Sequence, residues 1–309
     1  MCCRRHLVIV FVHIPNYYYT GLTNPQSTKN NANCVFFAGR GIRAVRSEPI
    51  RMMILTPTLT LALVLLAAVS LCAAPATAQS AEVAKGFLTK TVKVGRKDIR
   101  YVVFLPPSYD PNAPAPAIVF LNGAGECGTD GLKQIMVGIG SAIMVNVEKW
   151  PFIVVFPQKQ DVKHVWEDED PMVMGTIDAA RREYNIDPSR IYLTGLSQGG
   201  HGTWAIAARH PDLFAALAPI CGWGDEETAK KVAKLPIWVF HGDQDTAVNV
   251  DRAREMARWI EAAGGTCKLS IYEGVGHNSW DKAYREEELG EWFLAHARGA
   301  GNQVIGYRL

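Results

Sequence analysis

Cysteine is scarce in this sequence and has no arrangement that indicates a structural framework. Seven of the 309 residues are cysteine, and three of them, Cys127, Cys221 and Cys267, follow residue 78. Three cysteines at irregular spacing exclude the paired pattern of a disulfide-stapled fold. One disulfide bond between two of them is still possible, and the sequence does not indicate which pair. No cysteine or histidine pair has zinc-site spacing, so we expect no metal and no cofactor.

Runs of basic residues, internal repeats and low-complexity segments are also missing after residue 78. The whole chain has a formal net charge of +2, and its first 78 residues hold seven lysines and arginines against one acid, so the remainder carries −4. A mildly acidic chain without a Lys/Arg run does not indicate a nucleic-acid partner. Its length of about 230 residues suits one large α/β domain.

One long apolar run occurs, over 59–69, and it has the flanks of a secretory signal peptide. Arg51 precedes it and Ala76-Thr77-Ala78 follows it, which gives a basic start and a small-x-small cleavage site. We expect a signal peptide over 52–78, cleavage after about Ala78, and a secreted or periplasmic protein with no stable membrane anchor. A membrane anchor and a lipoprotein linked through Cys72 are the alternatives.

Residues 1–51 show no sustained hydrophobic period. Because signal peptides begin near the start of a protein, we interpret this segment as a non-native or disordered extension, with Met52 or Met53 as the true start. A long unstructured extension is the alternative. The mature domain is then predicted over 79–309.

Short apolar strands alternate with helical segments through this domain. Continuous apolar strands between helices predict a mostly parallel central sheet with helices on both faces, and the first two strands form a hairpin. Ligands of such sheets bind at the carboxyl ends of the strands. Strands are expected over 87–94, 99–105, 117–121, 152–156, 190–194, 214–220, 237–241 and 268–272, and helices over 131–146, 173–184, 199–209, 226–233, 251–263 and 281–297.

A Gly-x-Ser-x-Gly pattern occupies 195–199, with Ser197 at its centre. A β-branched and aromatic stretch leads into it, and a helical stretch follows and ends before Pro211. This is the context of a sharp strand-to-helix turn, in which a side chain at either flanking glycine position would collide with neighbouring chain. The helix start also directs free N–H groups and its positive dipole end toward the serine oxygen. The pattern therefore predicts that Ser197 is a nucleophile.

A serine hydroxyl needs a base to accept its proton, and the base needs an acid to orient it. Candidates for both follow the last two predicted strands, in the order Ser, Asp, His that this architecture uses. Asp243 and Asp245 follow one strand, and His277 follows the next. Asp243 comes directly after its strand and could simply shape the turn, so we favour Asp245 as the acid. We predict a catalytic triad of Ser197, Asp245 and His277.

Two backbone N–H groups are needed to bind the oxyanion of an acyl-transfer intermediate. We assign one to Gln198, directly after the nucleophile, and the other to Ala124 in the glycine-rich loop 122–128. The glycines of that loop let the backbone approach a substrate closely. They do not make a dinucleotide-binding fingerprint, because the third glycine and the helix start are wrongly placed.

Four stretches together carry a family resemblance. From about Tyr101 to Ala295 the chain resembles the α/β-hydrolase superfamily. Within it, the chain is similar to the bacterial secreted "predicted peptidase" branch, near the phospholipase/carboxylesterase and polyhydroxybutyrate-depolymerase-like esterases. The matching stretches are 120–126 (FLNGAGE), 190–200 (RIYLTGLSQGG), 241–245 (HGDQD) and 274–280 (GVGHNSW).

The resemblance implies an α/β-hydrolase fold with Ser197, Asp245 and His277 as the triad, the same choice that the residues themselves indicate. Two positions depart from the branch. Asn122 stands where a histidine is usual. Because asparagine can still form hydrogen bonds there, this departure bears on the detailed shape of the loop and not on activity. Cys127 replaces a common arginine, which bears on the preferred leaving group.

Four side chains are candidates for lining the substrate cleft. Each tryptophan falls in a loop at the expected active face, where it either packs under the loop or offers a platform for an aromatic or sugar ring. For Glu126 we favour an ion pair that shapes its loop over a role as a second catalytic acid. We interpret His201, one helical turn past the nucleophile, as a packed helix residue. The four candidates are Glu126, Trp166, Trp223 and Trp280.

These features predict a secreted serine hydrolase that cleaves small-molecule or polymer-borne carboxylic esters through an acyl-enzyme. A serine peptidase with the same triad is one alternative, and a catalytically silent hydrolase-like binding protein is another. Only fourteen residues, 221–234, connect the strand that ends at Ile220 to the next. This connection is too short for a cap domain, so we expect an open cleft.

Overall fold

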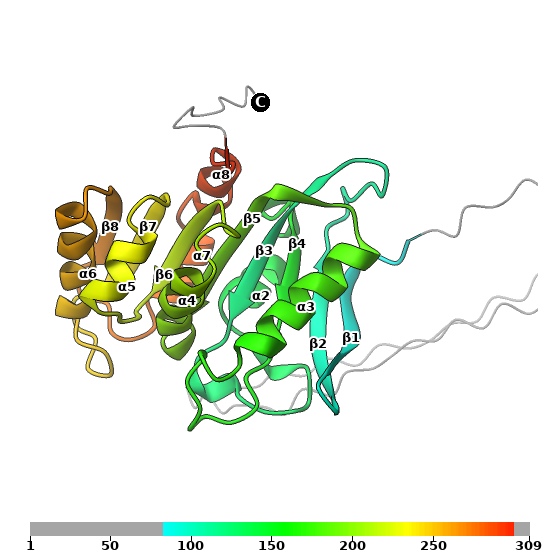
Figure 1. Cartoon of the computed structure of the whole chain (residues 1–309). Helices are drawn as coiled ribbons and strands as arrows, with labels where there is room; N and C mark the ends of the chain where they lie inside the picture. Colours follow the sequence, from blue (N-terminus) through cyan, green and yellow to red (C-terminus); the bar gives the residue numbers. More distant parts are fainter. Residues whose placement is uncertain (1–82, 300–309) are drawn as a thin grey trace, which may run out of the picture. The chain divides into compact units, whose positions relative to one another are not determined.

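The computed structural model describes residues 83–299, so the predicted N-terminal extension and signal peptide lie outside the described residues. An eight-stranded sheet forms the centre of this part of the chain, in the order β1-β2-β4-β3-β5-β6-β7-β8 (Figure 1). Strand β2 runs antiparallel to both β1 and β4, and every other pair of neighbours is parallel. The predicted mostly parallel sheet that begins with a hairpin is confirmed.

Strands form where short apolar or alternating runs are bounded by turn residues, and most lie close to the predicted ranges. The strands are β1 (Gly86–Val94), β2 (Lys97–Leu105), β3 (Ala115–Leu121), β4 (Ile153–Phe156), β5 (Ile186–Leu196), β6 (Ala216–Ile220), β7 (Ile237–Gly242) and β8 (Cys267–Tyr272). The helices are η1 (Ala124–Glu126), η2 (Lys133–Ile135), α2 (Gly138–Val145), η3 (Val147–Lys149), α3 (Asp170–Glu183), α4 (Gln198–Arg209), α5 (Glu226–Val232), α6 (Asp251–Ala262), α7 (Trp280–Arg285) and α8 (Leu289–Leu294).

The segment 131–146 is not the single helix that the sequence predicts, because it is broken into η2 and α2. Gly131 and Gly138 have φ angles of 70° and 57°, which a continuous right-handed helix does not allow. A Cβ atom on Gly138 would lie 2.8 Å from the Phe120 ring. The chain therefore turns at this glycine because it passes tightly over β3.

The predicted helix over 281–297 is also two helices, α7 and α8. The Nζ of Lys149 donates hydrogen bonds to the carbonyl oxygens of Arg285 (3.1 Å) and Glu287 (3.0 Å) and so caps the end of α7. A Cβ atom on Gly290 would lie 2.8 Å from the Lys149 carbonyl oxygen. The break thus has a tertiary cause, which lies more than a hundred residues earlier in the chain.

Helices cover both faces of the sheet, as predicted. Side chains alternate along the buried strands, so Val119 and Leu121 of β3 join one apolar core while Ile118 and Phe120 join the other. Helices α3, α4, α5 and α6 pack on the first face, and α2, α7 and α8 pack on the second (Figure 1).

The loops that leave the carboxyl ends of β3, β4, β5, β7 and β8 carry all of the predicted site residues except Trp223, which follows β6. The connection from β6 to β7 contains α5 alone, so no cap domain is inserted there. Within residues 83–299, no helix combines the length and apolar character that crossing a membrane requires.

Candidate active site

Ser197 lies between β5 and α4 in a strained conformation, with φ 55° and ψ −117°. The turn is tight enough to require both flanking glycines. A Cβ atom on Gly199 would overlap the Leu121 carbonyl oxygen, and a Cβ atom on Gly195 would overlap the Gly199 carbonyl oxygen. The Ser197 N–H donates to the Ile220 carbonyl oxygen at 3.0 Å, which ties the turn to β6.

One chain of hydrogen bonds joins Ser197, His277 and Asp245. The Nε2 of His277 lies 3.0 Å from Ser197 Oγ, and its Nδ1 lies 2.7 Å from Asp245 Oδ2. The Asp245 side chain is fully buried, whereas that of His277 is 28% exposed, so solvent reaches the ring but not its acidic partner. A proton held on Nδ1 by the carboxylate leaves Nε2 free to accept the serine proton.

The carboxylate of Asp245 is fixed by backbone groups of its own loop. Its Oδ1 accepts hydrogen bonds from the N–H groups of Ala247 (2.8 Å) and Val248 (2.9 Å). Burial alone would raise the pKa of Asp245, but the hydrogen bonds from His277 and from these two amides outweigh it and hold this pKa below its usual value. A negative charge therefore faces His277 throughout the neutral pH range.

Asp243 has a different position, in the turn that joins two loops. Its Oδ1 accepts a hydrogen bond from the Gly274 N–H at 2.8 Å, and its own N–H donates to the Tyr272 carbonyl oxygen at 3.1 Å. The turn-shaping interpretation of Asp243 fits these contacts. The adjacent Gly242 lets the loops meet, because a Cβ atom there would overlap the Val275 carbonyl oxygen.

Sequence reasoning missed a second histidine on the same carboxylate. His241, near the end of β7, is buried, and its Nε2 lies 3.1 Å from Asp245 Oδ2 and 2.9 Å from the Val248 carbonyl oxygen. Burial lowers the pKa of His241 despite the nearby carboxylate. The ring is therefore neutral and shares its Nε2–H between the two oxygens. The i, i+4 spacing of His241 and Asp245 was the available signal.

The backbone N–H groups of Gln198 and Ala124 donate to no other group within residues 83–299. Each residue is the first of its helix, Gln198 in α4 and Ala124 in η1, where backbone N–H groups are left without intrahelical partners. The loop 122–128 touches the end of β5, because a Cβ atom on Gly123 would lie 2.8 Å from the Leu196 side chain. Ala124 directly follows Gly123, and Ser197 and Gln198 directly follow Leu196, so both predicted oxyanion donors lie within two residues of this contact.

A buried lysine, also missed from the sequence, supports these loops. Lys159 follows β4 and is fully buried. Its Nζ donates to Gln198 Oε1 at 2.6 Å and to the His164 carbonyl oxygen, and its backbone N–H donates to Asn122 Oδ1 at 3.1 Å. Burial lowers the pKa of Lys159. Its place just after a predicted strand was the only sequence signal for this residue.

Trp166, one of the cleft candidates, is fully buried. Its ring packs against Gly202 of α4, where a Cβ atom would overlap the indole, and its Nε1 donates to the Asn122 carbonyl oxygen at 3.2 Å. This tryptophan packs beneath its loop and presents no face to a ligand.

The other two tryptophans are half-buried. Trp223 stacks on His201 with ring centroids 4.8 Å apart, and Trp280 meets His277 edge-on at 5.4 Å. The Nδ1 of His201 lies 2.9 Å from the Trp223 carbonyl oxygen and its Nε2 lies 3.1 Å from Glu167, so His201 is a packed helix residue. Trp280 is the candidate that contacts a predicted triad residue.

Glu126 forms no ion pair with any residue of the described range, so the expected loop-shaping ion pair is not found. Its carboxylate instead lies beside the Gly123 backbone, and burial raises the pKa of Glu126. The Gln158 Nε2 donates to the Glu126 carbonyl oxygen at 3.0 Å. Glu126 therefore shapes its loop through backbone contacts.

A pocket of about 550 Å³ opens beside the predicted oxyanion loop. A carboxylate, an amide and an imidazole stand in its wall together with small apolar groups, a lining that can bind hydroxyl groups of a ligand. The lining residues are Ala124, Cys127, Gln160, Asp161, Val162 and His164.

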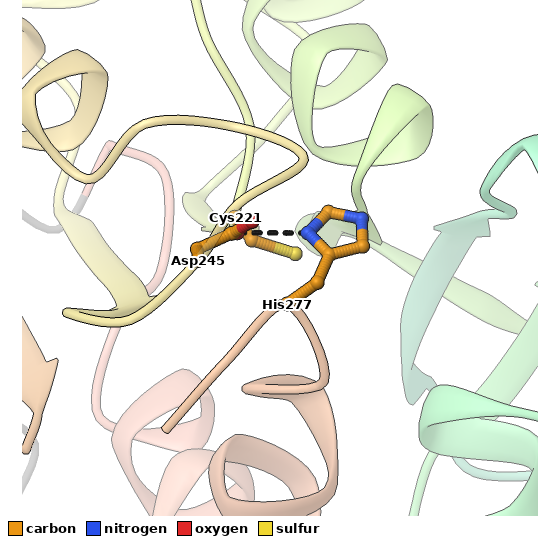
Figure 2. A group of neighbouring side chains, drawn as sticks. All are labelled: Cys221, Asp245 and His277. Atoms are coloured by element: carbon orange, nitrogen blue, oxygen red, sulfur yellow. Dashed lines mark hydrogen bonds and ion pairs between the residues drawn. The ribbon is translucent and has the colours of Figure 1, made fainter. Parts of the chain in front are cut away.

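The three cysteines in the described range are free, so no disulfide links them. One of them lies at the site. The Cys221 Sγ and one ligand atom each of Asp245 and His277 lie within 4.8 Å of one another (Figure 2). These three side chains could hold a metal ion. Sequence spacing did not reveal the group because its members come from three separate loops.

The chain is similar to known hydrolases and esterases. The family model described as "Dienelactone hydrolase family" matches residues 156–288, which include Ser197, Asp245 and His277. A solved thermostable esterase is 34% identical, with a TM-score of 0.63, and the match covers 69% of this chain and 63% of the esterase.

Two curated relatives are also similar. A bifunctional acetylxylan esterase/xylanase from Neocallimastix patriciarum is 32% identical over 32% of this chain, and poly(3-hydroxyalkanoate) depolymerase C from Paucimonas lemoignei is 29% identical over 60% of it. The chain spans 15% and 46% of these two relatives. With its sheet order, its strand-to-helix turn and these matches to hydrolases and esterases, the chain belongs to the α/β-hydrolase superfamily, and residues 156–288 are its dienelactone hydrolase family domain.

Proposed function

We propose that this protein is a serine hydrolase that cleaves carboxylic esters through a covalent acyl-enzyme. The hydrogen-bonded chain from Ser197 through His277 to Asp245 is the observation that carries the proposal. Ser197 Oγ attacks the ester carbonyl carbon while His277 Nε2 takes its proton. The same ring then protonates the leaving alcohol oxygen. Between these two proton transfers the Asp245 carboxylate stabilises the imidazolium.

The N–H groups of Gln198 and Ala124 are the proposed oxyanion donors. Both are free within the described part of the chain, and both stand at helix starts beside Ser197. Donors fixed in advance of the reaction stabilise the developing charge more than mobile water does. Water activated by His277 then hydrolyses the acyl-enzyme, which releases the acid and restores Ser197.

The pocket beside Ala124 supports an alcohol group that carries hydroxyls. Asp161, Gln160 and His164 offer hydrogen-bond acceptors and donors in a pocket that Ala124 also lines. Among the curated relatives are proteins named acetylxylan esterase/xylanase and feruloyl esterase B, names that refer to acetyl esters of xylan and to feruloyl esters. We propose small or polymer-borne esters of this kind as substrates.

Secretion is part of the same proposal, since the sequence over 52–78 has the features of a signal peptide. Amino-terminal sequencing of the protein recovered from the periplasm or medium of its native host should place the mature start near Gln79. Recovery only from the cytoplasm with the segment 52–78 intact would contradict this part.

The nucleophile is tested with a fluorophosphonate probe, which forms a stable bond with an activated serine. The wild-type protein and a Ser189→Ala control, altered near the amino end of β5, should be labelled, and Ser197→Ala should not. Ester turnover should follow the same pattern on a panel of short acyl esters, feruloyl sugars and peptide amides. Labelling or turnover that survives in Ser197→Ala refutes the mechanism, and turnover of the amides alone replaces the esterase by a peptidase.

A further inference from the structure

Cys221 is a buried thiol next to the proposed triad, and the proposed reaction does not use it. It directly follows β6, with φ 40°, and its N–H donates to the Phe240 carbonyl oxygen at 2.8 Å. Backbone geometry therefore fixes its position. Figure 2 shows its sulfur beside the hydrogen bond between Asp245 and His277.

The spacing of the three side chains approaches that of a metal site. Their ligand atoms lie within 4.8 Å of one another, and the pair from Asp245 and His277 is 2.7 Å apart. Tetrahedral zinc with sulfur, nitrogen and oxygen ligands places these atoms about 3.3–3.6 Å from one another. An ion would separate the carboxylate and the ring by less than about 1 Å and draw the thiol closer by up to about 1.5 Å, which side-chain rotation can supply.

A further polar group adjoins the thiol. Ser279 is fully buried, and its side chain interacts with the Cys221 thiol. Its hydroxyl oxygen offers an additional contact to an ion or to its bound water. Sulfur and imidazole ligands favour zinc and other soft or borderline ions over magnesium and calcium.

We propose that Cys221, Asp245 and His277 form a binding site for a soft divalent cation such as Zn²⁺, and that its occupation reversibly inhibits the enzyme. On binding, the thiol loses its proton to solvent and a sulfur–metal bond forms. The ring proton moves from Nδ1 to Nε2, and Nδ1 donates its lone pair to the metal. The carboxylate of Asp245 remains ionised and becomes an oxygen ligand.

Inhibition follows from this change of tautomer. A ring with metal on Nδ1 and a proton on Nε2 has no lone pair with which to accept the Ser197 proton. The metal also takes the carboxylate that orients the ring. The inhibitory part rests on the proposed function, whereas the binding part does not.

Binding is tested with Co²⁺ added to the purified protein, because a cobalt–thiolate bond gives a charge-transfer absorption band. The wild-type protein and Ser197→Ala should both show the band, and Cys221→Ala should not. The control Cys267→Ala, altered in the edge strand β8, should keep it. Absence of the band in the wild-type protein, or its loss in Cys267→Ala, overturns the site whatever the enzyme hydrolyses.

Inhibition is tested with Zn²⁺ against a soluble ester, each variant being compared with its own rate without metal. Cys221→Ala and Cys221→Ser should raise the half-inhibiting Zn²⁺ concentration at least ~10-fold, since even loss of an outer-shell partner has that effect. Cys127→Ser should keep the wild-type sensitivity, and Mg²⁺ should not inhibit. Equal sensitivity in Cys221→Ala, or its loss in Cys127→Ser, overturns the proposal. A cobalt band in a protein that hydrolyses no ester would instead contradict the proposed function.

Discussion

His241 Nε2 lies 3.1 Å from Oδ2 of Asp245, the oxygen that also faces the ring of His277. One carboxylate oxygen therefore accepts hydrogen bonds from two imidazole rings that differ in exposure. His277 is partly exposed and lies at Ser197, whereas His241 is buried and neutral. Because it shares its Nε2–H with the Val248 carbonyl oxygen, His241 holds the carboxylate in place.

The buried His241 should make the fold less stable in mild acid. Its pKa is lowered from the usual 6.5, so the unfolded chain binds a proton that the folded chain resists. Its contribution to stability is therefore complete above about pH 6.5 and is lost as the pH falls toward the folded pKa, by at most ~1.4 kcal/mol per pH unit. Urea unfolding between pH 5 and 8 should give a flatter pH dependence for His241→Gln than for the wild type. Identical slopes would show that folding leaves the pKa of His241 unchanged.

The two aspartates of the β7 loop should differ sharply in their effect on turnover. Asp245→Asn removes the charge that faces His277, and its kcat should fall by orders of magnitude, toward the ~10⁴-fold known for a well-studied triad protease. Asp243→Asn keeps a side chain of the same shape at the Gly274 N–H, so its kcat should fall far less. Steady-state kinetics on one ester decides the order, and a larger loss in Asp243→Asn would reverse the assignment of the acid.

Lys159 should influence kcat without touching the substrate. Its ammonium holds the Gln198 side chain, whose backbone N–H is a proposed oxyanion donor. Lys159→Met keeps the buried volume but releases that side chain, and kcat should fall about 10-fold, less than the ~10²–10³-fold that removal of a donor causes. KM should change little. The exposed neighbour Lys163, as Lys163→Met, is the matched control, and an equal effect in both variants would remove the positioning role.

Access to Ser197 should not depend on a lipid interface. The β6–β7 connection holds only α5, and no cap is inserted there. The rate on a sparingly soluble ester should therefore rise smoothly with concentration and show no jump at the solubility limit. A sharp increase at that limit would mean that a segment closes over Ser197 in solution.

The sheet, the turn at Ser197 and the loops of Asp245 and His277 could be predicted because each depends on local sequence. Strand periodicity, the two glycines and the chain order of the three residues are all readable along the chain, and the structure joins the three side chains by hydrogen bonds. Their catalytic roles stay a prediction.

Contacts between distant segments were not readable in this way. The break between α7 and α8 depends on Lys149, and the burial of Trp166 depends on its packing against Gly202. The thiol of Cys221 reaches Asp245 and His277 only after strands β6, β7 and β8 align. No spacing rule along one segment encodes such meetings.

The contact between Gly242 and the Val275 carbonyl oxygen has a consequence for engineering. The loop that bears Asp245 and the loop that bears His277 touch through their main chains, and Asp243 fastens them with a further hydrogen bond. The two loops therefore form one structural unit. A graft that moves one loop into another hydrolase without the other would separate acid from base, whereas residues 242–248 and 272–279 transplanted together carry their own alignment with them.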